Sequence, residues 1–78
     1  MNIEWREIYN HGSKLAIIDD LPMARIWESA NGDWRCLFGP AIHKHFPDAP
    51  RTTCKTEAGI RRRVEKYITL WVIAGRPT

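Results

Sequence analysis

Histidines, cysteines and aspartates are the side chains of this chain that could bind a metal or carry out catalysis. His43 and His45 lie on one side of any extended segment, because they are two residues apart. Cys36, Cys54 or His11 could complete a zinc site with them. The spacing is neither CxxC nor HxxxH, and two solvent-facing histidines in a basic loop fit the pattern better. We therefore predict no metal site and no cofactor.

No catalytic set can be recognised among these residues. A Cys–His pair would need an oxyanion-hole glycine pattern and an orienting residue, and the sequence shows neither. Asp19-Asp20 and Asp48 have the sequence context of turns. A glycine-rich loop that could hold a phosphate is also missing from the sequence. The sequence thus predicts a protein that is not an enzyme and has no catalytic residues.

Basic side chains are the stronger candidates for a binding site. The chain has 12 Lys and Arg against 9 Asp and Glu, a formal net charge of +3, which favours acidic partners. Arg62 and Lys66 are four residues apart and share one face of a predicted helix. Such a run is commonly a solvated face, here with Arg61 paired to Glu65; the functional alternative is contact with phosphates or an acidic surface. The predicted partner-binding residues of this region are Lys55, Arg61, Arg62, Arg63 and Lys66, with Arg51 just before them.

A tryptophan next to an arginine marks a second candidate. Trp34 and Arg35 follow Asn31-Gly32, which is a strong hairpin signal. An aromatic ring beside a positive charge suits single-stranded nucleic acid and a protein–protein hot spot equally well. We therefore predict that Trp34 and Arg35 bind a partner at the tip of the hairpin.

The elements that must position these residues fit one small α+β domain over residues 1–78. Apolar and β-branched runs separated by turn residues predict strands at about 3–9, 14–18, 23–29 and 34–38. Residues 39–55 contain three prolines and are predicted to be a loop, with a short extended piece at 41–46. An apolar stripe at spacings of four, four and three predicts a helix over about 57–74. The expected fold is a four-stranded antiparallel meander packed against this one C-terminal helix.

The predicted turn also fixes which side chains share a face of the sheet. A two-residue type I′ turn at Asn31-Gly32 places Ser29 opposite Trp34 and pairs Glu28 with Arg35. Arg25 and Arg35 then lie on opposite faces, and both faces carry apolar side chains. Because one helix covers one face, the other must meet the 41–53 loop, a second copy of the chain or a foreign partner. One predicted face has Met23, Arg25, Trp27, Trp34, Cys36 and Phe38. The other predicted face has Ala24, Ile26 and Leu37. The predicted core consists of Trp27, Phe38, Ile60, Val64, Ile68 and Trp71.

Two resemblances bear on function. Strands before a C-terminal helix, with Asn-Gly-Asp-Trp-Arg at the turn and Lys-Thr-Glu-Ala at the helix start, resemble DNA-binding modules of the phage-integrase arm and plant AP2 types. In those modules the sheet enters the major groove, which implies that Arg25 and Arg35 read DNA. In size and element order, the chain also resembles small accessory proteins of phages and mobile elements, among them anti-CRISPR inhibitors of bacterial defence.

These observations predict a non-enzymatic binding protein. The first expectation is a phage-type inhibitor that sterically blocks a host defence nucleoprotein complex. The alternatives are a small basic nucleic-acid-binding domain and a homodimeric structural module. The N-terminal residues show no signal-peptide pattern and no apolar run approaches the length of a membrane span, so we expect no membrane partner and a place in the cytoplasm of a bacterial host cell.

Overall fold

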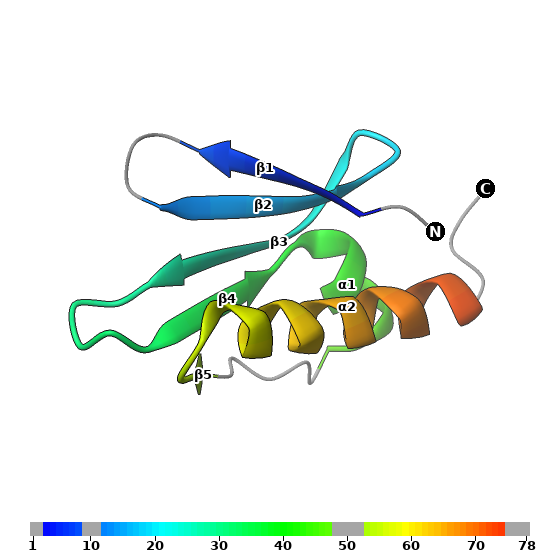
Figure 1. The fold of residues 1–78 in the computed structure, drawn as a ribbon. Helices are drawn as coiled ribbons and strands as arrows, with labels where there is room; N and C mark the ends of the chain where they lie inside the picture. The colour runs from blue at the N-terminus through cyan, green and yellow to red at the C-terminus, as the bar shows by residue number, and fades with distance from the viewer. Residues whose placement is uncertain (1–2, 9–11, 48–52, 75–78) are drawn as a thin grey trace.

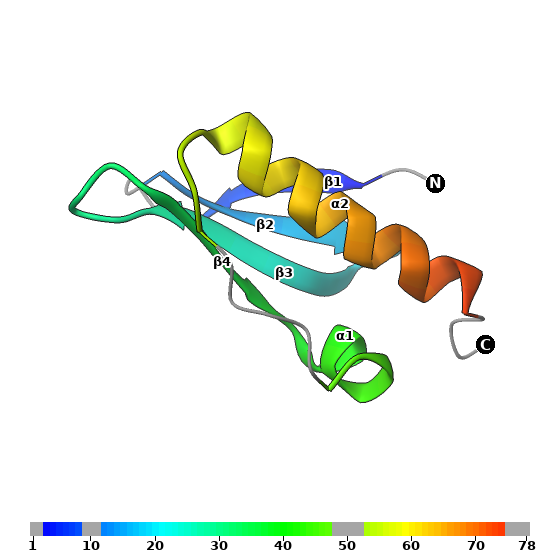
Figure 2. The ribbon, with the colours of Figure 1, turned by 90° about the horizontal axis from the view of Figure 1, so that it is seen from below.

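The computed structural model describes residues 3–8, 12–47 and 53–74. Their strands form one antiparallel sheet in the order β1-β2-β3-β4-β5, and α2 lies along one face of that sheet (Figures 1 and 2). The described elements are β1 (Glu4–Ile8), β2 (Ser13–Ile18), β3 (Leu21–Glu28), β4 (Trp34–Phe38), α1 (Pro40–His45), β5 (Thr53–Cys54) and α2 (Glu57–Ile73).

This architecture confirms the predicted α+β fold, a meander of four strands followed by a C-terminal helix. The prediction that 39–55 is a loop was wrong, because this segment contains α1 and the two-residue strand β5. Gly39 is extended and Pro40 stands at the first position of α1, where its missing N–H and fixed φ suit a helix start. The third strand begins at Leu21 instead of residue 23. Tyr9, the last residue of the first predicted strand, lies outside the described residues.

The two hairpin turns of the meander have different geometries. Asp19 and Asp20 both have positive φ, at 50° and 64°, so the β2–β3 connection is a two-residue turn of the type I′ class. At the β3–β4 connection, positive φ occurs only at Gly32, at 88°. The amide N–H of Ser29 donates to Asp33 O at 2.7 Å, and that of Gly32 donates to Ser29 O at 3.0 Å. This connection is therefore a longer loop with glycine in the left-handed position.

The longer loop shifts the β3–β4 register by one residue from the predicted one. Glu28 faces Trp34, Trp27 faces Arg35 and Ala24 faces Phe38. Because side chains alternate between the two faces, a shift of one residue changes which β3 and β4 side chains share a face of the sheet. The predicted face assignment and the predicted Glu28–Arg35 pair were therefore wrong. The face toward α2 carries Ala24, Ile26, Trp34, Cys36 and Phe38, and the opposite face carries Arg25, Trp27, Arg35 and Leu37.

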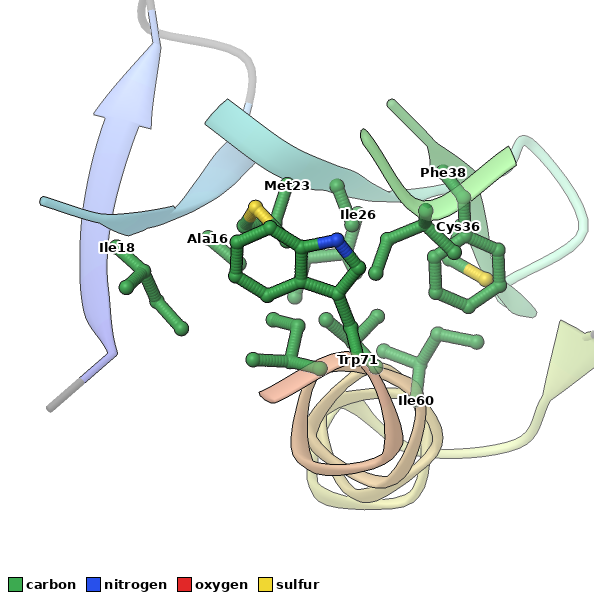
Figure 3. Packing of buried hydrophobic residues seen from close by; sticks show 12 residues of the cluster. Ala16, Ile18, Met23, Ile26, Cys36, Phe38, Ile60 and Trp71 are labelled. Atoms are coloured by element: carbon green, nitrogen blue, oxygen red, sulfur yellow. The ribbon is translucent and has the colours of Figure 1, made fainter. Parts of the chain in front are cut away.

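The hydrophobic core lies between α2 and one face of the sheet. Trp71 reaches from α2 toward the buried side chains of the strands (Figure 3). Thr56 caps this helix, its Oγ1 accepting a hydrogen bond of 3.1 Å from Gly59 N, and Ile42 of α1 is fully buried in the same cluster. The prediction that Trp27 belongs to the core was wrong, since it projects from the other face. The predicted core residues Phe38, Ile60, Val64, Ile68 and Trp71 are all buried.

Candidate functional site

The sheet face away from α2 combines arginines with apolar side chains. We call it the open face, because both helices contribute their buried residues to the core on the other side. Arg25 pairs with Leu37, and Trp27 pairs with Arg35. The Arg25 guanidinium lies 5.1 Å from the centroid of the Trp27 ring, a cation–π arrangement. Arg25 and Arg35, predicted on opposite faces, are thus neighbours on one face and flank the same indole.

Apolar contacts extend the open face beyond this arginine–tryptophan group. Leu15 lies opposite Arg25 in the β2–β3 ladder and is half-buried, while Leu37 is 37% exposed. A bulge between Ala16 and Ile17 interrupts the alternation at the far end of β2, and Ile17 is buried outside the core cluster. The open face therefore has an apolar floor with cationic side chains on it, a composition that suits a partner with both flat apolar and anionic groups.

Trp34 does not lie beside Arg35 as predicted for the hairpin tip. The two residues are consecutive in β4 and therefore point to opposite faces. Trp34 is half-buried, packs against the core cluster and pairs with Cys54 of β5. The ring that accompanies the arginines is Trp27 instead. The expected type I′ turn at Asn31-Gly32 places Trp27 and Arg35 on opposite faces of the sheet. For this reason the sequence did not indicate the Trp27 ring as the partner of the arginines.

One flank of α2 faces β1, and the cations there share one carboxylate. Glu57 Oε2 is 2.7 Å from Lys14 Nζ of β2 and also pairs with Arg61. The Arg61 guanidinium lies 5.0 Å from the centroid of the Trp5 ring. The hydrogen bond from Lys14 holds the pKa of Glu57 below its usual value; burial opposes this and the charge of Arg61 adds to it. Arg61 therefore has a role in the fold, although its partner is Glu57 and not Glu65.

The other flank of α2 faces β5 and keeps its positive charge. Arg62, Arg63 and Lys66 line a surface hollow of about 430 Å³ together with Gly59 and Cys54. Within the described ranges, the ion pairs involve the cations of Arg6, Lys14 and Arg61, so none reaches this flank. The two acidic residues of α2 are at positions 57 and 65, in line with Arg61 on the other flank. The cations at the hollow are therefore available to an anionic ligand.

These two basic surfaces meet at the β5 edge of the sheet. Thr53 lies beside Arg35 on the open face, and Cys54 of the next position lines the hollow on the helix side. Lys55 is exposed in the turn that leads from β5 into α2. Arg51, predicted to join this group, lies outside the described residues. We define the basic band as Arg25, Arg35, Lys55, Arg62, Arg63 and Lys66.

Other site predictions can be placed as well. His43 is exposed on α1, and the ring of His45 meets that of Trp71 edge-on, with centroids 6.4 Å apart. In the part of the chain that the structure describes, no group of three or more His, Cys, Asp or Glu side chains lies close enough together to hold a metal ion. Within the same ranges, neither helix combines the length and apolar character needed to cross a membrane.

Comparison of the chain with protein-family models, with curated proteins and with solved structures found no match.

Proposed function

We propose that this protein is a non-enzymatic nucleic-acid-binding protein that uses the open face and the basic band. The observation that carries this proposal is the placement of Arg25 and Arg35 around Trp27 on an uncovered sheet face. A base can stack on an indole whatever its identity, and guanidinium groups beside the ring contact the phosphates that flank the base. The register shift supports the proposal, because it brings to one face the two arginines that the resemblance to sheet-type DNA-binding modules implies as readers.

The charge distribution supports the same function. Cations that are already paired gain little from a phosphate, and the paired cations Lys14 and Arg61 lie on the β1 side of α2. The cations of the basic band have no ion pair among the described residues, so phosphates can replace the counterions around them. A nucleic-acid strand that crosses the β5 edge would contact the open face and the hollow together.

Salt dependence of binding tests this proposal. Fluorescence anisotropy with a labelled single-stranded oligonucleotide and with a duplex should show affinity falling by about 10³-fold or more between roughly 50 and 200 mM salt, if roughly six phosphates are contacted. Arg35→Gln and Arg62→Gln should each weaken binding and lower the salt slope by about one phosphate contact. Lys44→Gln is the matched control, since Lys44 is an exposed cation on α1, outside the open face and the basic band. The absence of binding to both oligonucleotides at low salt would contradict the proposal.

A second candidate function is occlusion of a host defence nucleoprotein complex, as expected for a phage-type inhibitor. The observation that favours it is the apolar floor of the open face, where Leu15, Trp27 and Leu37 lie among arginines as in a protein hot spot. An inhibitor should raise phage plaque counts on bacteria with active CRISPR immunity, and Trp27→Ala should abolish the increase. Unchanged plaque counts across such strains would speak against this second candidate.

A further inference from the structure

The free edge of β1 is a second surface with specific chemistry. β1 is the first strand in the sheet order and pairs with β2 alone among the described strands (Figure 1). An unpaired edge exposes backbone N–H and C=O groups that another strand can bind, and proteins usually block it with charged side chains. Glu4 and Arg6 provide such charges here, but they have opposite signs and are two residues apart on the open face. That spacing makes the edge complementary to itself.

Symmetry limits how two copies of β1 can pair. In an antiparallel pair related by a two-fold axis perpendicular to the sheet, one residue must face its own copy on the axis. Glu4, Arg6 or Glu7 on the axis would place like charges opposite each other, which destabilises a sheet. Ile8 is the last residue of the strand, so an axis there leaves little overlap. Trp5 is the remaining choice.

With Trp5 on the axis, Glu4 of each copy faces Arg6 of the other. Two ion pairs across the edge then replace the pair that Arg6 and Glu4 make within each strand, where both side chains are more than half exposed. On the α2 side the two Trp5 rings become neighbours, each beside its own Arg61 guanidinium. Aromatic pairs and opposite charges are favourable cross-strand partners. In this register every described charge at the edge other than Glu7 meets its opposite.

We propose that two copies of this chain form a two-fold dimer by antiparallel pairing of their β1 strands in this register. The dimer is one continuous sheet that joins the five strands of each copy, with both α2 helices on one side and both open faces on the other. A five-residue strand buries little surface, so the association is weak and reversible. The proposal does not depend on what the open face binds.

Charge exchange at the edge tests the register directly. Sedimentation equilibrium from about 10 µM to about 1 mM should show a monomer–dimer equilibrium for the wild-type chain. Arg6→Glu and Glu4→Arg should each weaken the dimer by about tenfold or more, because each places like charges across the edge. The double variant Glu4→Arg/Arg6→Glu should restore the wild-type dissociation constant, since exchanging the two charges again places opposite signs across the axis.

Controls separate this edge from other surfaces and from unfolding. Arg25→Glu lies on the open face away from β1 and should leave the dimer unchanged, and circular dichroism should show that every variant keeps the wild-type fold. A wild-type chain that is monomeric at the highest concentration overturns the proposal. Dimers that ignore the single substitutions, or that the double substitution fails to restore, overturn it as well.

Discussion

The two faces of the sheet use the same strands for opposite purposes. Toward α2, β3 and β4 contribute apolar side chains to the core, and Ile26 and Met23 are fully enclosed. On the open face, the alternating residues of the same strands are Arg25, Trp27, Arg35 and Leu37, all at least partly exposed. Substitutions on one face should therefore change stability, and those on the other should change binding. The largest effect is expected in the core.

Removing a core side chain should destabilise the protein strongly. Ile26→Ala leaves a cavity under α2 and should lower the free energy of unfolding by about 2–5 kcal/mol, as measured by urea denaturation. Leu37→Ala on the open face of the neighbouring strand is the matched control and should cost under about 1 kcal/mol, because its side chain is already 37% exposed. Equal losses for the two variants would show that the open face is not a separate surface.

Removing the indole of the open face should affect binding instead of folding. Trp27→Ala should weaken nucleic-acid binding by about 1–3 kcal/mol, the stacking contribution of one base. Anisotropy titrations of wild type and variant at equal salt measure this difference. Trp27→Phe, which keeps an aromatic ring, should retain most of the affinity. An affinity unchanged by Trp27→Ala would mean that the ring is not a stacking surface.

Acid should weaken the ion pairs of Glu57 with Lys14 and Arg61 at the edge of the sheet face that α2 covers. The pKa of Glu57 is lower in the folded chain than its ordinary value of 4.5, so its contribution to stability is fully present above that pH. The contribution is lost as the pH falls through the lower folded pKa. Glu57→Gln should cost about 0.5–1 kcal/mol at neutral pH in urea denaturation, and the difference from wild type should shrink toward pH ~3. A difference that is constant with pH would exclude the Lys14–Glu57–Arg61 network as its cause.

The smallest expected effect concerns the β2–β3 turn. Asp20 has a φ of 64°, which costs less for glycine than for other residues. Asp20→Gly creates the Asp-Gly pair favoured in type I′ turns and should stabilise the protein by about 0.5 kcal/mol, measurable as a higher Tm. Because this turn supports both faces equally, nucleic-acid affinity should not change. Destabilisation would indicate that Asp20 makes a contact worth more than its backbone strain.

The regular elements could be predicted from the sequence better than their pairing. The helix stripe of Ile60, Val64, Ile68 and Trp71 and the apolar strands carry strong periodic signals, and the structure confirms both. The pairing of β3 with β4 depended on Asn31-Gly32, which fits either a type I′ turn or a longer loop with glycine in the left-handed position. Local sequence does not distinguish these two turn geometries. The expectation of a type I′ turn therefore assigned Arg25 and Trp27 to the wrong face relative to the side chains of β4.

The missed parts of the candidate site have the same kind of cause. α1 and β5 are too short to show a period, although Gly39-Pro40 is a signal for a helix start that could have been used. The Glu57–Arg61 ion pair has the i,i+4 spacing of a helix and could have been expected from the sequence. The contact of Glu57 with Lys14, in contrast, spans 43 positions of the chain. A contact over that separation follows from the packing of α2 on the sheet, and no spacing within the helix predicts it.

The strand order also has a kinetic consequence. Each strand pairs with its neighbours in the sequence, so β1 to β4 assemble through successive hairpins with short connections. Closing short loops costs little chain entropy, and proteins dominated by such local contacts cross their folding barrier quickly. The strands should therefore pair in a rapid main refolding phase after dilution from urea, and the tight Asp19–Asp20 turn is a natural place for that phase to begin.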